Sequence, residues 1–119
     1  MTLTDALRKL QRTERIRSAW LPGMRWRWLV PSNNRFRWYR VNDRYEPPHV
    51  EPESWDLSDP ATVGCLLDLL REARGQEELR PAPETIEGRR MWLVPGMSVG
   101  QDTEGQAIAA ALIALAGAS

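Results

Sequence analysis

Residues that could carry out catalysis are few in this chain. The one histidine, His49, lies in a proline-rich segment, so a catalytic triad or a histidine metal site would have to be built around it alone. The one cysteine, Cys65, lies among leucines with no basic residue beside it to favour the reactive thiolate, and we interpret it as a small core residue. The glycines of "PGMSVGQDTEG" lack the lysine that completes a phosphate-binding loop. We therefore expect no enzyme and no cofactor.

Acidic residues gather between positions 46 and 59. Carboxylates there could bind a hard cation, but they lack the alternating ligand spacing and the turn glycine of a calcium loop. A solvated acidic face is the simpler interpretation, and we predict no metal site. As an acidic binding face that mimics nucleic-acid charge, the segment is the alternative to the basic hairpin described next. Its members are Glu46, Glu51, Glu53, Asp56 and Asp59.

The stretch "GMRWRWLVPSNNRFRWYR", residues 23–40, crowds five arginines and three tryptophans around a polar break. Alternation on both sides of the break predicts a β-hairpin. Arginine binds carboxylates and phosphates through bidentate contacts, so either an acidic protein or a nucleic acid would suit this segment. The candidate binding residues are Arg25, Arg27, Arg35, Arg37, Tyr39 and Arg40.

The turn decides which hairpin side chains share a face. A three-residue loop, 31–33, would have proline at its first position and Asn33 in the left-handed conformation. It would pair Trp28 with Phe36 and would separate an aromatic face from an arginine face, whereas a four-residue loop would set Trp28 opposite Arg37. The sequence favours the three-residue loop. We expect Trp26, Trp28, Phe36 and Trp38 to lie on one buried face, over the helix around residues 66–70.

The net charge of zero hides a strong asymmetry. Residues 1–45 hold eleven basic and three acidic side chains, whereas residues 46–119 hold five basic and thirteen acidic ones. Such a split suits either two halves that attract each other or a dipolar surface that steers a charged partner. Fifteen of the sixteen basic residues are arginine, which a GC-rich genome would also favour.

The remaining pattern predicts an α+β fold, with a small antiparallel sheet packed against two to three helices. The length of 119 residues suits a single domain, 1–119. We expect a mostly exposed helix over 4–19 that starts at Thr4 and Asp5, the hairpin over 24–41, an extended linker over 42–58, and a helix over 59–74. A short strand pair over 84–94, turning at 87–88, and a helix over 103–116 complete the chain.

The last helix is almost wholly apolar. Ile108, Ala111, Leu112 and Leu115 recur at helical spacing, so the helix should pack on a sheet or in an interface. A homodimer held by this alanine-rich helix is one alternative for the assembly of the protein. No apolar run reaches the length of a membrane span, the first residues are charged, and one cysteine cannot form an internal disulfide. We therefore expect a cytoplasmic protein without membrane contact.

The segments "LSDPATVGCLLDLLREARG" and "TEGQAIAAALIALA", with the tryptophan-bearing strand between them, resemble a group of small uncharacterised proteins encoded by bacteriophages and prophages. The resemblance covers roughly residues 55–116 and leaves out the basic hairpin. It implies an accessory protein without catalytic residues that acts in a bacterial host cell. The expected function is occlusion of a host protein or protein–nucleic-acid complex, such as anti-CRISPR-like inhibition of a defence system. A nucleic-acid-binding module and a homo-oligomeric virion protein are the alternatives.

Overall fold

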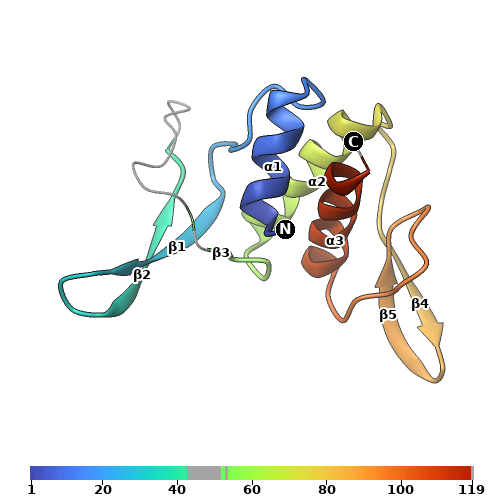
Figure 1. The fold of residues 1–119 in the computed structure, drawn as a ribbon. Helices are drawn as coiled ribbons and strands as arrows, with labels where there is room; N and C mark the ends of the chain where they lie inside the picture. The colour runs from blue at the N-terminus through green and yellow to red at the C-terminus, as the bar shows by residue number, and fades with distance from the viewer. Residues whose placement is uncertain (43–51, 53, 119) are drawn as a thin grey trace.

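The computed structural model describes residues 1–42, 52 and 54–118 of the chain. The fold is α+β, as the sequence predicts (Figure 1). Three helices lie at the centre, and two antiparallel hairpins extend from them in different directions. The helices are α1 (Leu3–Arg12), α2 (Pro60–Arg74) and α3 (Glu104–Gly117). The strands are β1 (Arg25–Val30), β2 (Arg35–Arg40), β3 (Ser54–Trp55), β4 (Ala82–Ile86) and β5 (Arg89–Leu93).

Helix α1 is shorter and more deeply buried than the sequence suggested. It begins at the N-cap Thr2, which forms a capping box with Asp5, and it ends at Arg12 instead of residue 19. The helix stops because Glu14 adopts a left-handed backbone conformation with φ of 60°. Ala6, Leu7 and Leu10 are fully buried, so the expectation of a mostly exposed helix was wrong.

Helix α2 follows its local sequence signals closely. Asp59 caps its N-terminus by accepting a hydrogen bond from the backbone N–H of Thr62, and Pro60 occupies the first turn. Gly75 ends the helix in the left-handed conformation, with φ of 66°. The predicted bounds of 59–74 are confirmed to within one residue.

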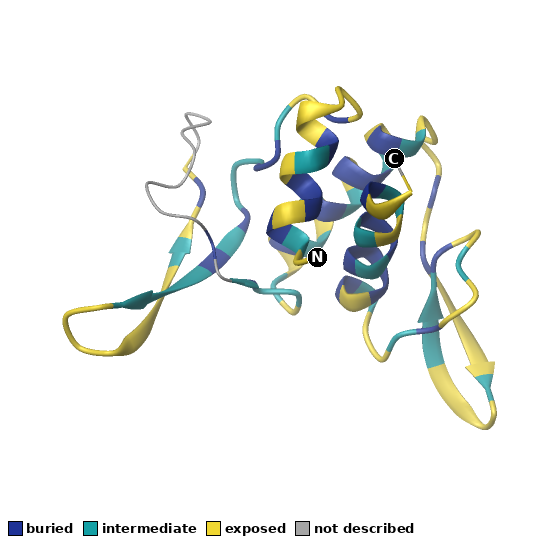
Figure 2. Ribbon diagram, viewed as in Figure 1, coloured by how far each residue is buried: buried dark blue, intermediate teal, exposed yellow. Residues whose placement is uncertain are grey.

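The core lies between the three helices, and α3 packs on both α1 and α2. Figure 2 shows the buried residues on the facing sides of the helices and the exposed residues at the tips of both hairpins. The alanines of α3 allow close approach, and Gly105, near its start, lies against the backbone of Leu57. Of the four apolar residues expected to pack, Ile108, Ala111 and Leu112 are fully buried and Leu115 is half-buried. None of the described helices is long and apolar enough to cross a membrane.

The three-stranded sheet has the order β2-β1-β3, with all strands antiparallel to their neighbours. Strand β3 falls inside the segment predicted to be an extended linker over 42–58, and its pairing with β1 corrects that prediction for residues 54–55. Trp55 of β3 is buried at 5% exposure and contacts Trp20 with ring centroids 5.2 Å apart. Its indole N–H donates to the buried hydroxyl of Thr4 at 3.1 Å. These contacts attach the base of the first hairpin to α1.

The second hairpin, β4–β5, turns at Glu87 and Gly88, as predicted. Both residues have positive φ, 51° and 78°, which is the geometry that matches the twist of a two-residue hairpin. Trp92 of β5 also forms an isolated bridge with Gln101, which leads the chain toward α3.

Candidate functional site: the β1–β2 hairpin

The turn of the first hairpin has four residues, 31–34, so the predicted three-residue loop was wrong. The backbone N–H of Asn34 donates to the Val30 carbonyl at 2.9 Å, and Asn34 takes the left-handed conformation that the sequence analysis assigned to Asn33. The side chain of Asn33 instead accepts a hydrogen bond from the backbone N–H of Arg35. Trp28 therefore faces Arg37, the pairing that the three-residue loop would have avoided.

This one-residue change in register turns over every side chain of β2 relative to β1. Directly paired residues of an antiparallel sheet share a face, and β1 pairs Arg27 with Trp38 and Leu29 with Phe36. Each face of the hairpin is therefore mixed. We call the face that carries Arg25, Arg27, Phe36 and Trp38 the stacked face. The predicted separation into an aromatic face and an arginine face is not observed.

Arginine and aromatic side chains alternate along the stacked face. The guanidinium of Arg25 lies 4.6 Å from the ring centroid of Trp38, and that of Arg27 lies 4.2 Å from the centroid of Phe36. Arg27 also lies 5.9 Å from the Trp38 ring. These are cation–π distances, and they hold the rings in place without burying them. Phe36 is 51% exposed and Trp38 is 40% exposed.

The prediction that four aromatic rings cover α2 is therefore wrong in most respects. Only Trp26 is buried, at 5% exposure, and it stacks on Tyr39 with ring centroids 4.8 Å apart. Trp28 is half-buried. Tyr39, predicted as a binding residue, thus serves as packing for Trp26.

Three of the predicted binding arginines are held by groups of the chain itself. Arg25 forms an ion pair with Asp56 at 2.9 Å, and Arg27 donates to the Ser54 hydroxyl at 2.8 Å. Arg40 forms an ion pair with Asp59 at 2.8 Å and donates to the Gly23 carbonyl. These contacts fix the base of the hairpin to the chain around the start of α2.

Arg35 and Arg37 differ from the other three arginines. Both are exposed, and across residues 1–42, 52 and 54–118 neither guanidinium takes part in an ion pair or a hydrogen bond. They flank Phe36 in sequence, and their side chains lie on the opposite face of β2 from the rings of Phe36 and Trp38. The end of the hairpin therefore combines two exposed aromatic rings with two exposed positive charges. We call Arg35, Phe36, Arg37 and Trp38 the hairpin tip.

The alternative acidic face is only partly described. Glu46, Glu51 and Glu53 lie outside the described residues. Asp56 accepts hydrogen bonds from Ser58, which with the bond from Arg25 hold the pKa of its carboxyl below the usual value. Arg40, together with Thr62, lowers the pKa of the Asp59 carboxyl further. Asp56 and Asp59 are thus committed to the sheet and to the cap of α2, not to a free acidic surface.

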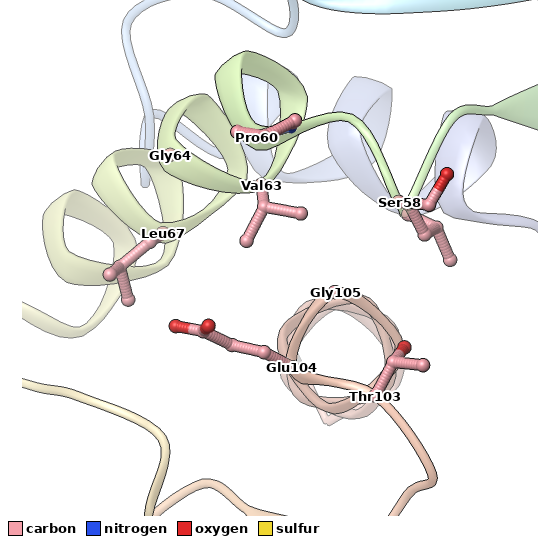
Figure 3. A pocket seen from close by; sticks show the side chains of 9 residues that line it. Ser58, Pro60, Val63, Gly64, Leu67, Thr103, Glu104 and Gly105 are labelled. Atoms are coloured by element: carbon pink, nitrogen blue, oxygen red, sulfur yellow. The ribbon is translucent and has the colours of Figure 1, made fainter.

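An open hollow of about 460 Å³ lies between the start of α2 and the start of α3. Figure 3 shows Val63 and Leu67 directed toward α3, with the Glu104 side chain in the space between the helices. The described lining is mostly aliphatic, with the hydroxyls of Ser58 and Thr103 and the carboxylate of Glu104 as its polar groups. In the described part of the chain, no three His, Cys, Asp or Glu side chains are grouped so that they could hold a metal ion.

Comparisons with known proteins identify no relative: no protein-family model, curated protein or solved structure matches this chain.

Proposed function

We propose that this protein is a non-enzymatic binding module that occludes a macromolecule of a bacterial host, with the hairpin tip as its contact surface. The observation that carries the proposal is the exposure of Phe36 and Trp38 beside the exposed guanidinium groups of Arg35 and Arg37. Tryptophan and arginine are enriched among the residues that dominate the energy of protein interfaces. Large rings held half-exposed by stacked arginines also lose little conformational entropy when a partner covers them.

A protein partner with an acidic surface suits the hairpin tip better than a nucleic acid does. One face of the Phe36 ring is covered by Arg27, and one face of the Trp38 ring is covered by Arg25, so these faces are not free to stack on bases. Three of the five hairpin arginines already bind groups of the chain, which leaves Arg35 and Arg37 to neutralise phosphates. Two charges support only weak electrostatic binding to nucleic acid.

The biological setting is part of the same proposal. Two observations support an inhibitor that acts by occlusion. They are the resemblance to phage and prophage accessory proteins and the suitability of the hairpin tip for binding. Anti-CRISPR-like inhibition of a defence complex is the form of this function that we favour. An occluding inhibitor requires affinity and shape but no active site.

Co-purification from bacterial extract tests the proposal. We compare the tagged wild-type protein with the R35E/R37E variant, whose fold should persist because both side chains are exposed and neither guanidinium has a partner among the described residues. The matched control is R80E/R90E, which makes the same change in charge at exposed positions before and within the second hairpin. We expect a host protein to be retained by the wild type and by R80E/R90E, in the presence of nuclease, and to be lost from R35E/R37E. Retention that nuclease abolishes would support the nucleic-acid alternative, and equal retention by all three proteins would refute a role for the hairpin tip.

A further inference from the structure

Strand β2 lies at the edge of the described three-stranded sheet. Among the described residues it pairs only with β1, whose other side is covered by β3 at Trp26 and Arg27. Arg35–Trp38 are exposed, and the strand extends over six residues. An exposed edge of this length can accept a further strand from another molecule.

The hydrogen-bonding pattern indicates which backbone groups point outward. The Val41 N–H donates to the Met24 carbonyl at 2.9 Å, which continues the β1–β2 register by one pair. On the other side of β1, the Asp56 N–H donates to the Arg25 carbonyl at 2.8 Å, so the backbone of Arg25 faces β3. The bonded direction alternates along an antiparallel ladder, so every second residue counted back from Val41 bonds toward β1. The residues between them, which include Phe36 and Trp38, direct their N–H and C=O groups away from β1, to the outer edge of β2.

The charges on β2 select the occupant of this edge. A second copy of β2 would bring arginine opposite arginine, which is unfavourable in a paired strand. An acidic strand is complementary to Arg35 and Arg37. Because these arginines lie on one face of β2 and the rings of Phe36 and Trp38 on the other, the best complement alternates acidic and apolar residues.

We propose that β2 binds its partner by strand addition, accepting an extended protein segment in which acidic and apolar residues alternate. This inference rests on the proposed function and specifies its partner. Acidic side chains of the segment pair with Arg35 and Arg37, apolar ones cover Phe36 and Trp38, and main-chain hydrogen bonds form with the backbone of Phe36 and Trp38. Nucleic acid lacks the peptide groups that this mode of binding requires.

Labelled synthetic peptides test the proposal by fluorescence anisotropy. The probe is a short capped peptide that alternates glutamate and valine, and its controls are a lysine–valine peptide and a single-stranded oligonucleotide of the same charge as the probe. Two further probes carry N-methyl groups on alternate residues, one on the glutamates and one on the valines. Only one of these sets can direct its N–H groups at β2, so one N-methylated probe should lose about tenfold or more in affinity while the other binds like the parent peptide.

Charge exchange supplies the second arm of the test. The R35E/R37E variant should lose the glutamate–valine probe and gain the lysine–valine probe, whereas R80E/R90E should bind like the wild type. Equal affinity for both N-methylated probes, preference for the oligonucleotide, or no binding of the parent probe would overturn strand addition. If a host protein is nevertheless retained through the hairpin tip in the co-purification, the binding function stands and only this mode of binding fails.

Discussion

Gly105 and Gly64 provide a matched pair of substitutions that tests the packing of the three helices. Both are glycines within helices, α3 and α2, and both border the hollow shown in Figure 3. A Cβ on Gly105 would overlap the backbone carbonyl oxygen of Leu57 and would also lie 3.0 Å from its carbonyl carbon. A Cβ on Gly64 would meet nothing within 4 Å. The same chemical change should therefore have opposite effects at the two positions.

The expected magnitudes follow from two competing terms. Replacing glycine by alanine in a helix interior stabilises the helix by about 1 kcal/mol, and overpacking costs about 1–3 kcal/mol. The cost at Gly105 should lie near the upper limit, because a backbone carbonyl cannot rotate away as a flexible side chain can. We expect Gly105→Ala to lower the free energy of unfolding by about 2 kcal/mol and Gly64→Ala to raise it by up to about 1 kcal/mol.

Thermal unfolding followed by circular dichroism measures both effects. For a chain of this length, 1 kcal/mol corresponds to about 3–6 °C in Tm, so Gly105→Ala should melt about 6–12 °C below the wild type and Gly64→Ala up to about 6 °C above it. Equal stabilisation by both substitutions would show that α3 does not approach Leu57 as closely as described, and would refute the reasoning.

Three further substitutions or reactions test other contacts. Thr4→Val, which keeps the shape but removes the hydroxyl between Trp55 and the Pro52 carbonyl, should cost about 1–3 kcal/mol in chemical denaturation, whereas Thr4→Ser should cost less. Asp59→Ala should cost about 1 kcal/mol more than Asp59→Asn, because asparagine still caps α2. Arg40 lowers the pKa of the Asp59 carboxyl in the folded state. The stability that the charge of Asp59 supplies is therefore fully present above the unfolded pKa of about 4 and is lost as the pH falls further. The difference in the free energy of unfolding between the wild type and Asp59→Asn should accordingly shrink in acid. Burial, with a smaller effect of nearby carboxylates, raises the pKa of the Cys65 thiol, so iodoacetamide at neutral pH should modify it more slowly in the folded protein than in denaturant, as mass spectrometry would show.

The elements that the sequence predicted well are those specified by local signals. The aspartate and proline at the start of α2 and the glycine after its end act through neighbouring residues, so the bounds of that helix could be inferred directly. The Glu87–Gly88 turn is another local case, since glycine readily takes positive φ. The end of α1 was missed because it depends on Glu14 in a left-handed conformation, which glutamate rarely adopts.

The sequence predicted which residues form the candidate site but not how those residues are arranged. Asn33 and Asn34 are equally able to take the left-handed position of the turn, so no local signal chose between the two registers. The pairing of β3 with β1 and the ion pairs of Arg25 and Arg40 arise between residues distant in sequence. For that reason the sequence identified the basic hairpin but could not distinguish the arginines that anchor it from the two that have no partner among the described residues.

Hydrogen–deuterium exchange on the protein, free and in complex with the host protein it retains, tests the central claim most directly. The edge amides of Phe36 and Trp38 point outward and should exchange quickly in the free protein. Binding through the hairpin tip should slow exchange in peptides covering 35–40 and leave those covering β4–β5 unchanged. Protection confined to β4–β5 or to the hollow between α2 and α3, with 35–40 exchanging as in the free protein, would contradict the assignment of the hairpin tip as the binding surface.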